Sequence, residues 1–157
     1  MRGVRQFVFL LALTLGCAAA LPAKDIAVIV NKGNDARSIT STELIKMCRL
    51  NARKWPGGRT VLVVMRDPSS PEMKLVLRKV YGMSAEEVRD LLAAGSHDRT
   101  RGPAFLFVDS DEVLVKMVAT NPGAIGLVDV YSITGAINVL KIDGKNPLEP
   151  GYTLHGN

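Results

Sequence analysis

Short apolar runs rich in β-branched residues alternate along the chain with longer segments whose apolar residues fall on one side. The runs predict strands, because a strand buried on both faces is apolar at successive positions, whereas an amphipathic helix is apolar only at every third or fourth. Five strands are predicted, at residues 26–30, 60–65, 104–108, 124–128 and 138–142.

Helix start and stop signals lie between these runs. A hydroxyl residue followed three positions later by Glu is a capping box, in which both side chains hydrogen-bond to backbone N–H groups at the helix start. Gly after the last apolar position, or a Pro-Gly pair, predicts a helix end. The predicted starts are Thr40 with Glu43, Ser70 before Pro71 and Glu72, Ser84 with Glu87, and Asp109 or Ser110; the predicted ends include Gly82 and Asn121-Pro122-Gly123.

The predicted elements follow the order strand, helix, strand, two helices, strand, helix and two strands. Strands that alternate with helices are typical of α/β folds, in which helices cover both faces of a sheet. We therefore predict a three-layer α/β sandwich with a mostly parallel sheet, as a single domain over residues 24–157. Ligands of such sheets bind at the carboxyl ends of strands and at helix N-termini.

Residues 1–23 have the pattern of a secretory signal peptide. Arg2 and Arg5 precede a short apolar run, residues 7–15, and the small residues after it offer cleavage sites after Ala20 and Ala23. The run is shorter than the roughly 20 apolar residues that span a bilayer, and a buried core helix is the alternative interpretation. Removal of residues 1–23 lowers the formal net charge from +5 to +3, which is too small to indicate a nucleic-acid partner.

The two cysteines bear on the compartment. Cys17 follows the apolar run as in a lipoprotein signal, but Leu15 is one position too close to it, so membrane anchoring through a lipidated Cys17 is the less favoured alternative. Without Cys17 the exported chain has one thiol, Cys48, and no internal disulfide. Export without a disulfide framework favours a bacterial periplasm. Cys48 lies on the apolar side of its predicted helix and is expected to be buried rather than catalytic.

Four motifs follow one another along the chain: Val28-Ile29-Val30-Asn31; Glu43-Leu44 with Trp55-Pro56-Gly57-Gly58; Arg66 to Gly82, which opens as Arg-x-x-x-Ser; and Asn121-Pro122-Gly123-Ala124-Ile125-Gly126-Leu127-Val128. In this order they resemble the substrate-binding proteins of phosphate ABC transporters, which have the type 2 periplasmic binding fold. The Pro-Gly-Ala-Ile-Gly segment is the most specific of the four. Full members of that family have two lobes, and the resemblance covers one, so it implies a single-lobe relative.

The first candidate site comprises Arg66, Ser69 and Ser70. Backbone N–H groups and a hydroxyl at a helix N-terminus suit an anion, and an Arg upstream adds a bidentate partner for phosphate or carboxylate. The family's pattern there is Arg-x-x-Gly-Ser-Gly-Thr, in which Arg66 and Ser70 match, whereas Ser69, Pro71 and Glu72 replace Gly, Gly and Thr. Pro71 removes an N–H donor and Glu72 adds a negative charge, so the resemblance implies weak binding at most. A capped helix beside a solvated Arg66 is the alternative.

The second candidate is the polar loop from Ser96 to Gly102. Arg99 and Arg101 in this loop could border a cleft and attract an anion, although a solvated surface loop is the favoured interpretation. His97 and Asp98 have no nucleophile placed beside them by the sequence. The residues show no metal-ligand spacing and no cofactor-binding loop, so we expect neither a metal, a cofactor nor an enzyme.

Two function classes therefore remain. The first is a periplasmic, phosphate-binding-protein-like module that binds phosphate or another small anion weakly at a helix N-terminus. The second is a scaffold or interaction protein that uses the same lobe to contact a protein partner. A homodimer that rebuilds a cleft would reconcile the two.

Overall fold

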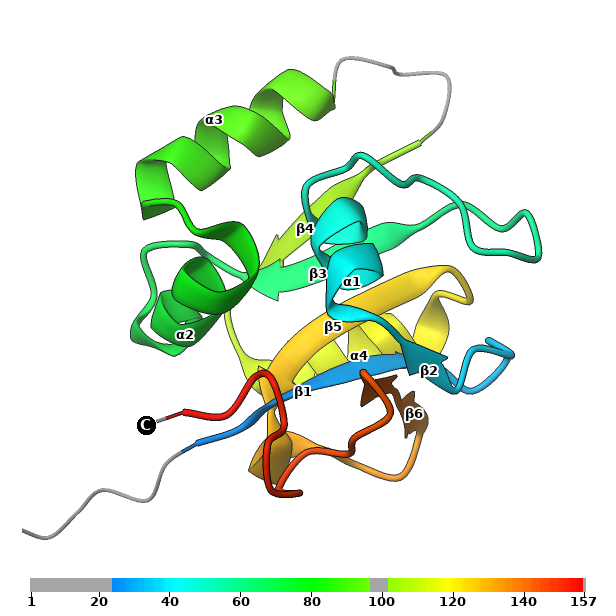
Figure 1. Ribbon diagram of the computed structural model, residues 1–157. Helices are drawn as coiled ribbons and strands as arrows, with labels where there is room; N and C mark the ends of the chain where they lie inside the picture. The colour runs from blue at the N-terminus through cyan, green and yellow to red at the C-terminus, as the bar shows by residue number, and fades with distance from the viewer. Residues whose placement is uncertain (1–23, 97–101, 157) are drawn as a thin grey trace, which may run out of the picture.

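A five-stranded sheet runs through the middle of the molecule, and helices cover both of its faces (Figure 1). The computed structural model describes residues 24–96 and 102–156. The sheet is built from the strands β1 (Ile26–Asn31), β3 (Leu62–Arg66), β4 (Phe105–Val108), β5 (Ala124–Asp129) and β6 (Ile137–Val139). The first four of these strands confirm the predictions at residues 26–30, 60–65, 104–108 and 124–128.

The strand order is β4-β3-β5-β1-β6. Strand β3 pairs in parallel with both β4 and β5, whereas β1 pairs antiparallel with both β5 and β6. Four of the five strands therefore run in one direction, and β1 alone runs against them. This confirms the predicted α/β fold with a mostly parallel sheet.

The two faces of the sheet carry separate hydrophobic clusters, because successive side chains of a strand point to opposite faces. Val28 and Val30 of β1 belong to one cluster, and Ala27 and Ile29 belong to the other. The first cluster is covered by α1 (Ser41–Cys48), the helical segment of residues 71–81 and α3 (Ala85–Gly95); the second is covered by α4 (Asp111–Thr120). Figure 1 shows α4 on the opposite side of the sheet from α1, which gives the three predicted layers.

The predicted capping boxes are present. Thr40 and Glu43 cap α1, and the Glu43 carboxylate accepts a hydrogen bond from the Thr40 backbone N–H at 2.9 Å. Ser84 and Glu87 cap α3 in the same way, at 2.7 Å. For α4 the structure selects Ser110 of the two alternatives, since its hydroxyl accepts from the Val113 N–H.

The helix predicted from Ser70 to Gly82 is irregular. It consists of a 3₁₀ turn η1 (Pro71–Met73), a short α-helical stretch α2 (Lys74–Val76) and a π-helical turn η2 (Leu77–Tyr81). Gly82 ends it in the left-handed conformation, with φ 60°, as predicted. The helical segment starts after Ser70 with Pro71 at its first position, as predicted, but the Ser70 side chain makes no capping hydrogen bond. The Tyr81 side chain is fully buried, and its hydroxyl donates to the Cys48 carbonyl at 3.0 Å, which fixes the end of the π-helical turn against α1.

The single strand predicted at residues 138–142 is also wrong. The chain forms two strands there, β6 and β7 (Lys141–Ile142), and β7 pairs in parallel with β2 (Ser38–Ile39) in a separate small sheet. Leu140 between them is fully buried, and its N–H donates to the Val28 carbonyl at 2.8 Å. This bond holds the chain where it passes from the large sheet to the small one.

The C-terminal segment after β7 has no regular structure but packs along the start of β1. The Ile26 N–H donates to the Leu154 carbonyl at 3.0 Å, and the Tyr152 hydroxyl donates to the Ile26 carbonyl at 2.9 Å. Asp25 is fully buried and accepts from the Leu148 N–H at 2.7 Å, while its other oxygen lies 2.5 Å from the His155 Nδ1. The segment therefore covers the start of β1, at the end of the sheet where β5 finishes.

Candidate functional site

Four strand ends bring charged residues together at one edge of the sheet. Because β3, β4 and β5 are parallel, their carboxyl ends meet at the same edge. Arg66 is the last residue of β3, Asp129 is the last of β5, and Asp111 opens α4 just after β4. Lys24 joins them because β1 runs in the opposite direction, so its beginning lies at this edge.

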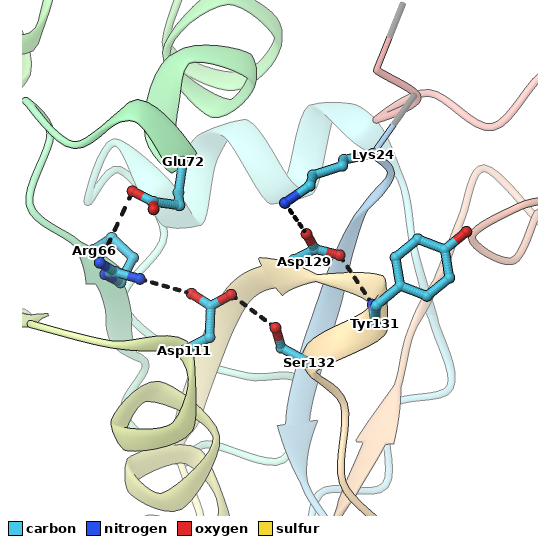
Figure 2. A network of polar contacts seen from close by, with 7 residues as sticks. All are labelled: Lys24, Arg66, Glu72, Asp111, Asp129, Tyr131 and Ser132. Atoms are coloured by element: carbon cyan, nitrogen blue, oxygen red, sulfur yellow. Dashed lines mark hydrogen bonds and ion pairs between the residues drawn. The ribbon is translucent and has the colours of Figure 1, made fainter. Parts of the chain in front are cut away.

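The Arg66 guanidinium is held by two carboxylates, as Figure 2 shows. Its Nη1 lies 3.1 Å from Asp111 Oδ1 and its Nη2 lies 3.8 Å from Glu72 Oε2. The second oxygen of Asp111 accepts a hydrogen bond from the Ser132 hydroxyl at 2.9 Å, which fixes that carboxylate. The Glu72 side chain is 46% exposed, whereas those of Arg66 and Asp111 are 18% and 19% exposed.

The Glu72 carboxylate is held in its charged form. A hydrogen bond from its own backbone N–H lowers its pKa most, and the positive charge of Arg66 lowers it further. This carboxylate is therefore ionised near neutral pH and competes with any anion that approaches Arg66.

A second ion pair lies at the other side of the same edge. Lys24 Nζ is 3.1 Å from Asp129 Oδ2, and the other Asp129 oxygen accepts from the Tyr131 N–H at 3.0 Å (Figure 2). The hydrogen bond to Asp129 raises the pKa of Lys24. Tyr131 belongs to η4 (Val130–Ser132), and this residue is 70% exposed.

These two networks border a pocket of about 350 Å³. Buried carbon atoms of β1, β5 and the 71–81 segment line it, from Ile26, Leu127, Val128 and Met73. Its charged lining consists of the cations Lys24, Arg66, Lys74 and Arg78 and the anions Glu72, Asp111 and Asp129. The pocket therefore combines a carbon-lined wall with a charged border, and the cations outnumber the anions.

The three predicted site residues do not share this pocket. Arg66 lines it, whereas Ser69 and Ser70 are not among the lining residues. Ser69 is exposed, and its N–H donates to Asp67 Oδ1 at 2.8 Å; Asp67 is also paired with Arg89 at 2.5 Å. The Ser69 N–H bond is the largest cause of the lowered pKa of Asp67. The loop of residues 67–70 is thus closed by its own hydrogen bonds.

Two buried polar atoms in this region have no hydrogen-bond partner in the described part of the chain, Arg66 Nε and Ser70 Oγ. The two carboxylates therefore contact the Nη1 and Nη2 groups of Arg66 but leave its Nε–H without an acceptor in the described residues. The other predicted residues, Arg99 and Arg101, lie outside the described residues, as does His97.

Sequence reasoning missed Lys24, Asp111, Asp129, Lys74 and Arg78. Asp111 and Asp129 could have been found, because each stands at the carboxyl end of a predicted parallel strand, where ligands of such sheets bind. Lys24 could not, since its place depends on the reversed direction of β1. Lys74 and Arg78 lie four positions apart, but the change from α-helical to π-helical turns between them could not be predicted, so neither could the side of the helix that they share.

The one thiol of the described residues, that of Cys48, lies in the core. Cys48 is fully buried, as predicted, and burial raises the pKa of its thiol to about 12, so the reactive thiolate is not formed near neutral pH. Residues 24–96 and 102–156 contain no group of three or more His, Cys, Asp or Glu side chains that could hold a metal ion. None of the helices in these ranges is long and apolar enough to cross a membrane.

No protein-family model matches the sequence, and no curated protein matches it. Solved structures do match. An ABC-type phosphate transport receptor from Vibrio cholerae aligns with a TM-score of 0.69 at 17% identity, over 85% of this chain and 54% of its own. A putative phosphate ABC transporter substrate-binding protein with bound phosphate, from Clostridium perfringens, aligns with a TM-score of 0.69 at 19% identity, over 85% and 53%. PstS from Borrelia burgdorferi aligns with a TM-score of 0.64 at 16% identity, over 86% and 55%.

The chain thus spans about half the length of these solved proteins. At such low identity the likeness establishes the fold. The chain has the α/β fold of phosphate ABC transporter substrate-binding proteins, over about half of their length.

Proposed function

We propose that this protein is a phosphate-binding-protein-like module that binds phosphate or another small oxyanion weakly in the pocket beside Arg66. One observation about Arg66 supports the proposal. Arg66 lines a cation-rich pocket at the carboxyl end of a strand, and its Nε has no hydrogen-bond partner within residues 24–96 and 102–156. An oxyanion can accept from guanidinium N–H groups two at a time. The phosphate bound in one of the solved structures of this fold supports the ligand class.

Glu72 is the group that the anion would displace. Its contact with Arg66 is 3.8 Å long and its side chain is half exposed, and exposed ion pairs of this kind contribute about 0–1 kcal/mol. The Asp111 contact is shorter and is fixed by Ser132, so Asp111 stays in place and repels the incoming anion. The expected affinity is therefore low, with a Kd of about 0.1–1 mM.

Isothermal titration of the purified protein with phosphate tests this. Glu72→Gln is expected to tighten binding about fivefold, because a unit charge about 4 Å away in water-like surroundings is worth about 1 kcal/mol. Arg66→Ala is expected to abolish the heat signal. Glu86→Gln is the matched control, since Glu86 is exposed on α3 and does not line the pocket. Phosphate affinity that is equal in all four proteins would contradict the proposed site.

The second candidate function is a scaffold or interaction protein, and a specific observation favours it. Both guanidinium ends of Arg66 already contact carboxylates, and Ser69 and Ser70 lie outside the pocket. Tyr131, exposed at the same edge, is of the residue type that often dominates protein interfaces. No heat at millimolar phosphate from a protein with a folded far-UV spectrum would favour this role. Light scattering would then test for a homodimer, and cross-linking in cells for another partner.

We further propose that the protein acts in the periplasm as a binding module and not as an enzyme. The support is the signal-peptide pattern of residues 1–23, which lie outside the described residues. Mass spectrometry of the periplasmic fraction is expected to find a chain that begins at Leu21 or Lys24. If the protein fractionates with membranes and Cys17→Ala releases it, the lipoprotein alternative is correct.

A further inference from the structure

The pocket is larger than a phosphate ion requires. Its volume of about 350 Å³ falls within the range of about 300–1,000 Å³ that is typical of sites for small organic molecules. A single tetrahedral oxyanion beside Arg66 would leave most of that volume to water. Much of the remaining space faces carbon, since Ile26, Met73, Leu75 and Leu127 are among the residues that line it.

Two of the four cations that line the pocket, Lys74 and Arg78, take no part in the ion pairs described above. Arg66 is paired with Asp111 and Glu72, and Lys24 is paired with Asp129. Lys74 and Arg78 also line the pocket, are exposed, and have no ion-pair partner recorded in residues 24–96 and 102–156. They stand four positions apart in the 71–81 segment, a spacing that puts two side chains on one side of a helix.

The arrangement therefore has two parts that suit one molecule. The buried carbon wall suits an apolar body, and the unpaired cations at the border suit a negative head group. A cationic ligand is disfavoured, because the three carboxylates of the lining are already paired with Arg66 or Lys24. A neutral apolar ligand would leave the charges of Lys74 and Arg78 unused.

We propose that the preferred ligand of this pocket is an organic anion, in which a phosphate or carboxylate head group is attached to an apolar body. The head group contacts Lys74, Arg78 and, once it displaces Glu72, the Nη2 of Arg66, and the body lies on the wall formed by Ile26, Met73 and Leu127. The inference rests on the proposed anion-binding function and narrows its substrate class from inorganic phosphate to a substituted one.

Titration of the whole protein with four probes tests the two parts separately. Phenyl phosphate has both parts, inorganic phosphate has only the head group, benzyl alcohol has only an apolar body, and benzoate carries the alternative head group. Phenyl phosphate is expected to bind about tenfold tighter than inorganic phosphate, because burial of part of the ring adds apolar contact. Benzyl alcohol is expected to give no measurable heat. The tighter binder of phenyl phosphate and benzoate identifies the preferred head group. The inference holds whichever of the two it is, provided that phenyl phosphate binds more tightly than inorganic phosphate.

Substitutions assign the binding to the pocket. Lys74→Ala with Arg78→Ala is expected to weaken phenyl phosphate about tenfold, whereas Lys79→Ala is the matched control, because Lys79 is exposed on the same segment and does not line the pocket. Leu75→Ala, at a partly buried lining residue, is expected to reduce the advantage of phenyl phosphate over phosphate without changing phosphate binding. Both parent and variant spectra in the far UV confirm that the chain is folded.

The outcomes separate this inference from the proposed function. If phosphate binds through Arg66 but phenyl phosphate binds no tighter, the organic-anion inference is overturned and the phosphate module stands. If neither binds, both are overturned. If phenyl phosphate and benzyl alcohol bind equally and the Lys74/Arg78 double variant changes nothing, the pocket is a plain apolar site, and the inference is again overturned.

Discussion

Two glycines in the segment from Asn121 to Val128 are required by close packing. A Cβ atom added at Gly123 would lie 2.1 Å from the Thr60 carbonyl oxygen, a backbone atom that cannot move aside. A Cβ added at Gly126 would lie 2.6 Å from Leu114 and 2.9 Å from Val118, the side chains that pack α4 onto the sheet. Close packing therefore explains the glycine at both positions of the motif that most resembles the phosphate-binding family.

We predict that Gly123→Ala and Gly126→Ala each lower the free energy of unfolding by about 1–3 kcal/mol, the usual cost of overpacking. Gly57→Ala is the control, because a Cβ there has no atom within 4 Å and φ is not positive. Its effect should stay within about 0.5 kcal/mol. Urea unfolding measures all three; equal values for Gly57→Ala and Gly123→Ala would show that the close approach is not what selects glycine.

At the scale of the elements, helix starts were the most predictable feature. Capping depends on residues three positions apart in the sequence, so Thr40 with Glu43 and Ser84 with Glu87 could be recognised without tertiary information. The type of helix between Pro71 and Tyr81 could not, because the π-helical turn depends on where Tyr81 is buried against α1. The break at Leu140 was missed for the same reason, since an apolar run does not say which sheet each residue joins.

The caps of α1 and α3 make a prediction for single substitutions. Ser84→Ala should lower the free energy of unfolding by about 1 kcal/mol, because the Glu87 N–H loses its acceptor at the start of α3. Ser96→Ala is the control at the other end of the same helix, where the hydroxyl only donates to a carbonyl that water can reach. Thermal unfolding followed at 222 nm compares the two, and a larger loss for Ser96→Ala would contradict the capping role.

The same boxes predict how stability depends on pH. Hydrogen bonds from the Thr40 and Ser84 backbone N–H groups lower the pKa of Glu43 and of Glu87. Because the pKa of each group is lower in the folded chain than in the unfolded chain, its contribution is complete above the ordinary Glu pKa of about 4.3 and is lost as the pH falls through the lowered value. Urea midpoints between pH 6 and pH 3 should fall most steeply below about pH 4. A Glu43→Gln/Glu87→Gln double variant should show a flatter profile.

At the scale of the whole molecule, the candidate site is assembled from segments that are remote in sequence. Arg66 was predicted because it sits in a local motif. Asp111 and Asp129 follow from the position of each after a parallel strand, whereas Ser132 and Lys24 are brought there by the turn after β5 and by the reversed direction of β1, which local patterns do not encode. The sequence therefore predicts Arg66 but not the full composition of the pocket around it.

The C-terminal segment contributes to the stability of the whole sheet. Tyr152 is buried, and its hydroxyl donates to the Ile26 carbonyl at the start of β1. Tyr152→Phe should lower the free energy of unfolding by about 1–2 kcal/mol, because the buried carbonyl loses its donor while the ring packing is kept. Tyr131→Phe, at an exposed ring, is the control and should have no measurable effect. A loss of less than about 0.5 kcal/mol for Tyr152→Phe would show that the segment does not hold β1 in place.

The position of the reversed strand β1 in the sheet also determines when it can pair with its neighbours during folding. All six of its residues are buried, and its neighbours in the sheet are β5 and β6, which end at residues 129 and 139. Contacts between such distant parts of a chain form slowly, and during synthesis they must wait for the later part to leave the ribosome. Strand β1 is thus made before both of its neighbours and covered only after them, and until then it is an apolar segment that a chaperone can bind.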